Sequence, residues 1–201
     1  MTAVATRRRA DARRLLAQAD SDPSARQKLD ALAPDQPHGA VLAERLRFGP
    51  PETWLGWRAG LGRVIVKLWP DGSRLTPLPR VAHPGVAPLV DQGAGWRMFA
   101  WVAGETLAAA LRRGTAPLSA AGQVAEAVAA LHAAGIAHGD LNPANIVVGA
   151  HGAVLIDWGE DDCAGTPGWR PEGPHDRFLR DHHALERLRA LICGPPADGT
   201  P

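Results

Sequence analysis

The order of apolar and polar positions divides the chain into stretches that predict different kinds of structure. Residues 1–33 are rich in Ala, Arg and Leu, and their apolar positions predict two short amphipathic helices separated at Asp20–Pro23. Residues 34–39, with Pro and Gly, are typical of a linker. Residues 40–102 consist of short apolar runs between Gly and Pro turns, which favour strands. Helical spacing returns beyond residue 103.

The strand-rich stretch contains four apolar runs that predict strands. They are Ala40–Phe48, Trp54–Arg58, Arg63–Trp69 and Trp96–Val102. Gly60-Leu61-Gly62 is typical of a tight turn between the second and third runs. This part of the chain therefore predicts a small strand-rich lobe.

The stretch beyond residue 103 predicts three helices and one inserted β-hairpin. The helices are Glu105–Arg113, ended by Gly114, then Ser119–Ala134, capped by Ser119 and ended by Gly135, and finally Arg180–Ile192. Between the last two, Ile146–Val148 and Ala153–Ile156 predict short strands joined by a Gly-containing turn at 149–152. The second half of the chain is therefore expected to be a helical lobe.

Composition excludes several classes of protein. With 45% apolar and 21% charged residues and a net charge of +1, the chain is expected to be globular and not a general nucleic-acid binder. Its apolar runs are too short for a membrane span, and no apolar stretch follows the arginines between Arg7 and Arg14, which excludes a secretory signal. Cys163 and Cys193 are too few for a disulfide framework, so we expect a reducing, cytoplasmic environment.

The chain contains far more arginine than lysine. Of 22 Lys and Arg residues only two are lysines, Lys28 and Lys67. Lys67 stands inside the apolar run Arg63–Trp69, where a compact ammonium group could contact one phosphate or could reach from a strand to water. Both interpretations of Lys67 stay open on this observation. The arginines of residues 7–14 are expected to form a solvated helix face, with an acidic partner or anionic lipid as the alternative.

The candidate chemistry lies in the helical half of the chain. Asp140 and Asn145 are five residues apart in a predicted loop between a helix and a strand, and Asp157 directly follows the next strand. Phosphoryl transfer requires such a set, because one carboxylate orients the acceptor hydroxyl while a carboxamide and a second carboxylate hold Mg²⁺. For each residue taken alone, a turn residue is the preferred interpretation. The oxygen donors favour magnesium over zinc.

Histidines near these residues are expected to be structural. His138 is taken as part of the scaffold of its loop and not as a base, since a single His beside a turn usually has that role. His182, His183 and Glu186 could touch a metal ion, but a solvated helix face is the preferred interpretation, because no further ligand is indicated.

Taken in order, these stretches resemble the motifs of the protein-kinase-like superfamily. His138-Gly139-Asp140 followed by Asn145 is similar to the catalytic loop, in the form common in the atypical and small-molecule branches. Asp157-Trp158-Gly159 resembles the metal-binding Asp-Phe-Gly motif, with Trp in place of Phe. Val64-Ile65-Val66-Lys67 resembles the third-strand motif whose lysine contacts the α- and β-phosphates.

Three further stretches resemble the same superfamily. Residues 96–107 look like the hinge and the start of the next helix, and Gly165–Glu172 resembles the end of an activation segment in bacterial Ser/Thr kinases. Asp181, followed by Ala184-Leu185, looks like the aspartate that holds the catalytic loop through backbone hydrogen bonds. The resemblance covers about residues 40–193.

The resemblance implies an α+β, two-lobed protein-kinase-like fold with a small antiparallel-sheet N-lobe and a truncated helical C-lobe. Its implied domains are an N-terminal helical extension and linker (1–39), an N-lobe with the hinge (40–102) and a C-lobe (103–201). It also implies ATP bound between the lobes, with adenine against the backbone of Ala100–Val102 and behind Phe99. The implied catalytic residues are Asp140 and Lys67, and the implied metal ligands are Asn145 and Asp157, which hold Mg²⁺.

The sequence departs from the kinase pattern at two places that concern the phosphates. Between Lys67 and Phe99 there is no glutamate that could hold the lysine toward the phosphates, because the only acidic residues there are Asp71 and Asp91. Lys67 is therefore oriented by Asp157, Glu44 or Glu52, or by no carboxylate at all. The phosphate-covering loop at 48–54 has one glycine and two prolines, which leave few backbone amides for phosphate.

We therefore predict an ATP- and Mg²⁺-dependent phosphotransferase that transfers the γ-phosphate to a hydroxyl group, with no nucleic-acid partner. The stretch 165–172 favours a protein Ser/Thr acceptor, whereas the His-Gly-Asp loop and the short helical half are typical of kinases of small molecules or glycans. Of these, we favour protein. The alternative from another class is a pseudokinase, a nucleotide-binding or scaffolding module.

Overall fold

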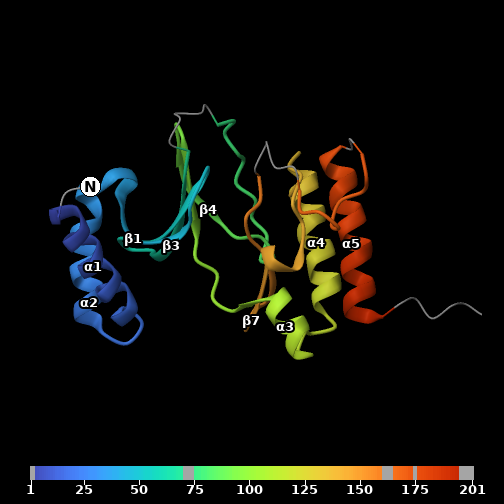
Figure 1. The fold of residues 1–201 in the computed structure, drawn as a ribbon, viewed down its shortest axis with the longest axis horizontal. Coiled ribbons are helices and arrows are strands. Elements are labelled where there is room, and N and C mark those ends of the chain that lie inside the picture. The colour runs from blue at the N-terminus through green and yellow to red at the C-terminus, as the bar shows by residue number, and fades with distance from the viewer. Residues whose placement is uncertain (1–2, 70–74, 160–164, 174–175, 195–201) are drawn as a thin grey trace, which may run out of the picture. The chain divides into compact units, whose positions relative to one another are not determined.

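The protein is described by a computed structural model in residues 3–69, 75–159, 165–173 and 176–194 (Figure 1). Its backbone forms two compact units. Unit 1 comprises Met1–Pro77 and Leu89–Trp101, and unit 2 comprises Leu78–Pro88 and Val102–Pro201. The segment Leu78–Pro88 therefore belongs with the second half of the chain, although it stands between strands of unit 1 in the sequence.

Unit 1 contains a five-stranded antiparallel sheet. Its strands are β1 (Ala40–Arg47), β2 (Glu52–Arg58), β3 (Gly62–Leu68), β4 (Leu89–Gly93) and β5 (Trp96–Ala100), in the order β1-β2-β3-β5-β4. The four predicted strands are present. β4 was not predicted, because only its first two residues are apolar, and it forms by pairing with β5.

Two helices precede this sheet and lie side by side, α1 (Ala3–Gln18) and α2 (Pro23–Leu32) (Figure 1). As predicted, they are separated near Asp20–Pro23, and Asp22 caps α2 by accepting a hydrogen bond from Ser24 N at 2.8 Å. The predicted linker is instead two short 3₁₀ turns, Ala33–Asp35 and Pro37–Gly39.

The apolar side chains of unit 1 form two clusters. One joins the helices to the strands, and it contains Ala12, Leu16, Ala19, Leu29, Ala33, Val41, Ala43 and Trp57. The other lies within the sheet and contains Ala40, Trp54, Val64, Val66 and Met98. The apolar positions predicted from the sequence therefore build the core of this unit.

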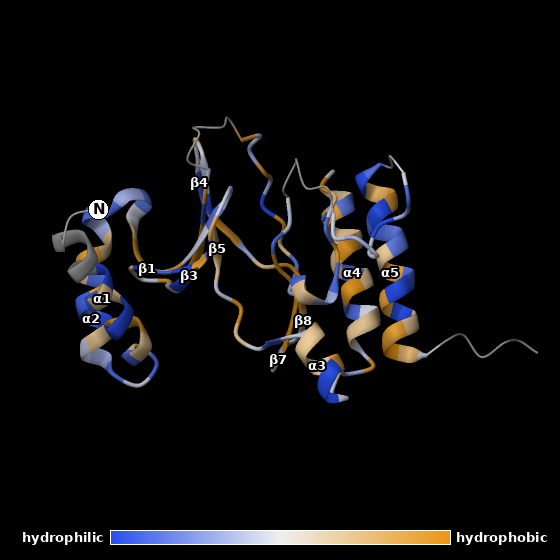
Figure 2. Ribbon diagram, viewed as in Figure 1, coloured by the Kyte–Doolittle hydropathy of each residue, from blue (hydrophilic) through white to orange (hydrophobic). Residues whose placement is uncertain are grey.

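In its described residues, unit 2 combines three helices with a small sheet. The helices are α3 (Leu107–Arg113), α4 (Ala120–Ala133) and α5 (Arg177–Cys193), and the strands are β6 (Glu105–Thr106), β7 (Ile146–Gly149) and β8 (Gly152–Leu155), in the order β6-β7-β8. A 3₁₀ turn, Pro143–Asn145, precedes β7. α4 and α5 lie side by side, and α4 is apolar where α5 is largely polar (Figure 2). The predicted hairpin and helices are present.

The helix starts differ from the prediction, and the caps explain why. α3 begins at Leu107 because Glu105–Thr106 pairs with β7, and Thr106 Oγ1 caps the helix by accepting from Ala109 N at 3.2 Å. α5 begins at Arg177 because Asp176 caps it. Ser119 is the N-cap residue of α4, as predicted, but its side chain makes no capping hydrogen bond.

The segment Leu78–Pro88 joins unit 2 by pairing with β8. Val86 forms a parallel bridge with Leu155, whose N–H donates to Gly85 O at 2.8 Å and whose O accepts from Ala87 N at 2.9 Å. This segment thereby supports the strand that leads directly to Asp157.

No helix among the described residues has the length and apolar character needed to cross a membrane. Cys193 is an exposed free thiol, and Cys163 lies outside the described residues.

Candidate active site

The loop that precedes Asp140 is held by a buried carboxylate on α5. Asp181 is fully buried, and it accepts hydrogen bonds from His138 N at 2.7 Å and from Gly139 N at 2.9 Å. His132 Nε2, from the last turn of α4, lies 2.9 Å from the same carboxylate. The expected role of Asp181 in holding the loop through backbone hydrogen bonds is confirmed. Helices α4 and α5 therefore fix the position of this loop.

His138 links the same loop to the strand end before Asp157. Its buried ring places Nε2 3.0 Å from Ile156 O, so Nε2 carries the hydrogen and donates it to this carbonyl. Burial lowers the pKa of His138, partly offset by the carboxylates of Asp181, Asp157 and Asp140. The imidazole is therefore neutral and structural, as the sequence analysis expected.

Asp140 and Asn145 lie together at the end of this loop. Asn145 Nδ2 donates to Asp140 Oδ2 at 3.2 Å and to Asp140 O at 2.9 Å. Asn145 O accepts from Ile156 N at 3.0 Å, so Ile156 is bonded to the loop through both its N–H and its carbonyl. The loop and the residue before Asp157 therefore form one hydrogen-bonded unit.

A second set of hydrogen bonds ties Asp140 to the segment beyond Gly165. Thr166 N donates to Asp140 Oδ1 at 2.6 Å. Asn142 Nδ2 donates to Thr166 Oγ1 at 3.2 Å and to Asp140 O at 3.0 Å, while Asn142 Oδ1 accepts from Ala144 N at 2.9 Å. Each oxygen of the Asp140 carboxylate thus accepts one hydrogen bond and retains a further lone pair.

Asp157 has an unusual backbone conformation. Its φ is +65°, which is uncommon for a residue with a Cβ and is found preferentially at functional sites. The next residue, Trp158, is buried, and its Nε1 donates to Ala87 O at 3.0 Å. Gly159, with φ +80°, could not carry a Cβ, because that atom would lie 2.5 Å from Leu78 Cδ1. Both neighbours therefore fix the backbone of Asp157.

Lys67 belongs to unit 1. It lies on β3, opposite Thr53 of β2 and Arg97 of β5, and it is 2% exposed. Directly paired residues of an antiparallel sheet share one face, so Lys67 and Arg97, which is 1% exposed, are two neighbouring buried cations. Arg97 donates to Thr76 O at 2.9 Å and lies over the Trp69 ring.

Two of the carboxylates considered for orienting Lys67 have arginine partners. Glu44 pairs with Arg13 at 3.0 Å, and Glu52 pairs with Arg45 at 3.4 Å. Asp91 likewise pairs with Arg58 at 2.8 Å, and Asp71 lies outside the described residues.

Two of the residues predicted to contact adenine, Phe99 and Ala100, lie on β5, the strand next to β3. Phe99 is buried on β5 opposite Ile65, and Ala100 pairs with Val64. Val102 lies beyond the end of β5 and is the first residue of the main part of unit 2.

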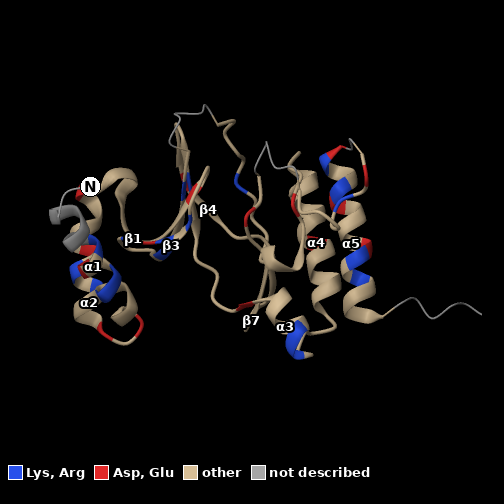
Figure 3. Ribbon diagram, viewed as in Figure 1, with Lys and Arg blue, Asp and Glu red and all other residues tan. Residues whose placement is uncertain are grey.

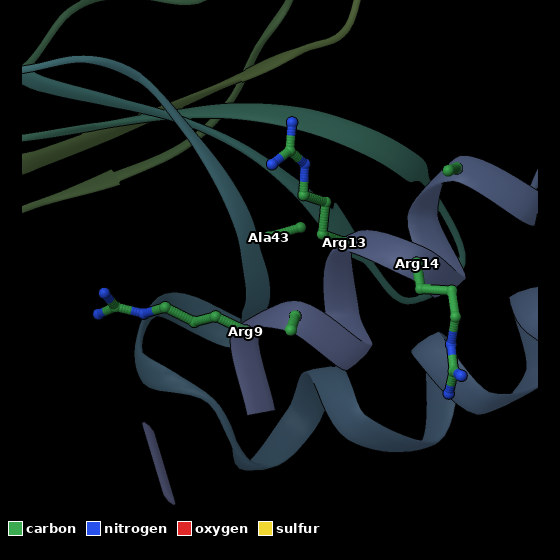
Figure 4. Close-up of a pocket in the computed structure, with 6 residues that line it drawn as sticks. Arg9, Arg13, Arg14 and Ala43 are labelled. Carbon is green, nitrogen blue, oxygen red and sulfur yellow. The ribbon is translucent and has the colours of Figure 1, made fainter. Parts of the chain in front are cut away.

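Two shallow hollows lie in the described residues of unit 1, and the smaller one is lined in part by Arg63 and by Trp101, which lies within the stretch predicted to contact adenine. The larger, of about 470 Å³, is lined by Arg9, Ala10, Arg13, Arg14, Ala17 and Ala43. Its three guanidinium groups point in different directions and do not converge on one point (Figure 4). In the described residues there is no cluster of three or more His, Cys, Asp and Glu side chains suited to a metal ion, so His182, His183 and Glu186 form none.

The sequence analysis missed three residues that shape these surroundings. His132 stands six positions before His138 and could have been found as a second histidine of the same helix-to-loop segment. Thr166 lay in the stretch 165–172 that resembles the end of an activation segment, but its contact with Asp140 was not predicted. Arg97 was hidden in an apolar run, as Lys67 was.

Comparisons with known proteins bear on the same stretch of chain. The model of the lipopolysaccharide kinase (Kdo/WaaP) family matches residues 101–160, which contain Asp140, Asn145 and Asp157. A search of curated proteins finds no match. The crystal structure of the M. tuberculosis PknI kinase domain is similar, with 21% sequence identity and a TM-score of 0.56, over 81% of this chain and 76% of that chain.

The chain has a protein-kinase-like fold. This kinase-like fold is α+β with an antiparallel sheet, so the predicted fold class and the resemblance stated from the motifs are confirmed. The family match and the fold together support the prediction of an ATP-dependent kinase.

Proposed function

We propose that this protein transfers the γ-phosphate of ATP to a hydroxyl group of a saccharide, with Mg²⁺ as the metal ion. The observation that carries the proposal is the hydrogen-bonded unit of Asp140, Asn145 and Ile156, the residue before Asp157. It supports the proposal because Asp140, Asn145 and the residue before Asp157 belong to one hydrogen-bonded segment of unit 2, and phosphoryl transfer uses such a set of polar residues.

Asp140 is the residue that receives the acceptor proton in this proposal. The acceptor oxygen forms a bond to the γ-phosphorus, the bond from that phosphorus to the bridging oxygen breaks, and ADP leaves with the electron pair. The hydroxyl proton passes to a carboxylate oxygen of Asp140. Both oxygens are oriented, one by Thr166 N and the other by Asn145 Nδ2, and each keeps a lone pair for this proton.

Asn145 and Asp157 are the residues proposed to hold Mg²⁺. The donor chemistry fits, because a carboxylate and a carboxamide oxygen are hard ligands. Asn145 Nδ2 is used by Asp140, so its Oδ1 is the atom left to face a cation. A magnesium ion held in part by the nucleotide phosphates needs only few protein ligands. When bound, Mg²⁺ would neutralise charge on the phosphates.

Lys67 is proposed to contact the α- and β-phosphates, and Phe99, Ala100 and Val102 to contact the adenine. Lys67 is almost fully buried and stands opposite a second buried cation, Arg97, so its ammonium group does not reach water as that of an exposed lysine would. This supports a polyphosphate role for Lys67 over the alternative of a lysine that merely reaches water.

The acceptor is proposed to be a saccharide because the lipopolysaccharide kinase family model covers the catalytic segment. The sequence analysis favoured a protein Ser or Thr, on residues 165–172, which the family match does not include. A protein acceptor is therefore the outcome that the experiment has to distinguish.

The test is a transfer assay with ATP labelled on its γ-phosphate. The protein is incubated with Mg²⁺ and, separately, with delipidated lipopolysaccharide saccharide and with a mixture of Ser- and Thr-containing peptides. We expect label on the saccharide and a loss of about 10²- to 10⁴-fold in rate for Asp140→Asn, because general-base catalysis contributes this much. Asp35→Asn, at an exposed position of unit 1, is the matched control and should keep the wild-type rate.

The other outcomes decide between the alternatives. Label on the peptides alone would restore the protein Ser/Thr acceptor. ATP binding without transfer to any acceptor would leave a nucleotide-binding pseudokinase. Full transfer by Asp140→Asn would remove Asp140 from the mechanism.

A further inference from the structure

Arg170, just beyond the segment docked on Asp140, is a cation that the proposed mechanism does not use. It is half-buried, and within the part of the chain that the structure describes its guanidinium has no hydrogen-bond or ion-pair partner. Arg112 and Arg189 of the same unit also have none there, but they are exposed. A guanidinium that is withdrawn from water without a partner gains most from a bound anion.

The backbone before Arg170 is fixed on both sides. Thr166–Trp169 is a type II turn, with Pro167 at its second position, Gly168 at φ +80°, and Trp169 N donating to Thr166 O at 3.0 Å. Thr166 N is bonded to Asp140 Oδ1, and Arg187 of α5 lies 5.4 Å over the Trp169 ring. The turn therefore holds the position of Arg170 relative to Asp140.

The side chain of Arg170 passes beside the catalytic loop. A Cβ built on Gly165 would lie 3.3 Å from Arg170 Cδ and equally 3.3 Å from Gly139 O. The stem of Arg170 thus lies close to the residue that precedes Asp140. Gly165 has φ +74°, and its missing side chain leaves the room through which this arginine passes.

The catalytic loop is close to three carboxylates, while Arg187 is a second cation near the turn that precedes Arg170. Asp140, Asp157 and Asp181 all act on the His138 ring, and they would repel an acceptor that carries its own negative charge. Arg170 supplies the opposite charge at this place, in a planar fork that binds a carboxylate or phosphate through two hydrogen bonds. Figure 3 shows that α4 carries almost no charge, whereas basic and acidic segments lie on α5.

We propose that Arg170 is a specificity-determining residue that binds a carboxylate or phosphate group of a small polyhydroxyl acceptor, next to the hydroxyl that Asp140 orients. This inference rests on the proposed function and narrows its saccharide class to acidic members. A neutral saccharide offers this guanidinium only hydroxyl oxygens, which accept weaker hydrogen bonds than a carboxylate or phosphate does.

The test uses one sugar in three charge states: glucose, glucuronate and glucose 6-phosphate. Transfer of labelled γ-phosphate from ATP is measured for each. The two charged sugars distinguish a carboxylate from a phosphate as the preferred group. For the wild type we expect kcat/KM about ten- to a hundredfold higher for at least one charged sugar than for glucose, the gain from a hydrogen-bonded charge.

Arg170→Gln should lose this preference through a higher KM for the charged sugar, so that its kcat/KM for that sugar falls to its value for glucose. Arg170→Lys, which keeps the charge but not the fork, should recover only part of it. Arg189→Gln, which removes the same charge from the exposed face of α5, should behave as the wild type. Because Arg170 has no protein partner among the described residues, the melting temperature of Arg170→Gln should equal that of the wild type.

Three results would overturn the inference: equal use of all three sugars, an Arg170→Gln enzyme that keeps the preference, or transfer only to acidic Ser-containing peptides. ATP binding is measured in the same samples by thermal shift. A wild type that binds no ATP contradicts the proposed function itself. A wild type that binds ATP but transfers to none of the three sugars likewise contradicts the proposed function. A wild type that transfers to glucose but to neither charged sugar contradicts only the role of Arg170.

Discussion

The position of the catalytic loop depends on Asp181, and this dependence can be measured. The carboxylate has no exposed surface and accepts hydrogen bonds from His138 N, Gly139 N and His132 Nε2 at 2.7, 2.9 and 2.9 Å. A hydrogen bond to a charged group contributes about 1.5–3 kcal/mol. Asp181→Ala removes three such bonds and leaves buried donors without an acceptor, so we expect a loss of about 4–6 kcal/mol in the free energy of unfolding.

The milder variant Asp181→Asn keeps the fold accessible to measurement. Its amide oxygen can take the position of Oδ2 and keep two of the hydrogen bonds, while its NH₂ faces Gly139 N–H and loses the third. We expect a loss of about 2 kcal/mol for this variant.

The assay is urea denaturation followed by tryptophan fluorescence, and its control is Glu186→Ala on the exposed face of α5. The control should change the free energy of unfolding by less than about 0.5 kcal/mol. If Asp181→Ala is as stable as this control, Asp181 does not hold the loop and the reasoning from its buried hydrogen bonds is wrong.

Three further variants test other parts of unit 2. Gly159→Ala should lower the free energy of unfolding by about 2–4 kcal/mol, because its φ is positive and its Cβ would meet Leu78, whereas Gly122→Ala on α4 should raise it by about 0.5–1 kcal/mol in the same denaturation assay. Trp158→Phe, which restores the residue usual in the kinase motif, should cost about 1–3 kcal/mol by thermal denaturation, because the buried carbonyl that its indole serves is left unpaired. Burial makes the pKa of His138 lower in the folded than in the unfolded state, so its contribution to stability is present above pH 6.5 and is lost as the pH falls below 6.5. His138→Gln should therefore reduce the loss of stability between pH 6.5 and 5 by up to about 1.4 kcal/mol per pH unit. If the free energy of unfolding of this variant depends on pH as steeply as that of the wild type, the burial argument is wrong.

Much of the fold followed from local pattern in the sequence. The two N-terminal helices, the hairpin of β7 and β8, and the two helices α4 and α5 carry clear periodicity and stop signals, and all are present. Asp181 was found because the resemblance gave its partners as the backbone of the catalytic loop.

The remaining features depend on pairing between distant residues, which local pattern does not encode. Strand β4 forms by pairing with β5. Val86 pairs with Leu155 of β8, although the two residues lie far apart in the sequence. The contact of Thr166 with Asp140 likewise joins two motifs that were recognised separately, and neither motif indicated the hydrogen bond between them. Arg170 could not be recognised, because its lack of a partner is a property of the folded unit.

The most direct test of the central claim is a thermal-shift titration with ATP, with and without Mg²⁺, on the wild type and on Asp157→Ala. A nucleotide that binds only the folded chain at a hundred times its Kd stabilises it by about 2.7 kcal/mol, so the wild-type Tm should rise with ATP and Mg²⁺ together. The rise should disappear in Asp157→Ala or when Mg²⁺ is chelated. An equal rise in Asp157→Ala, or no rise in the wild type, would contradict the account.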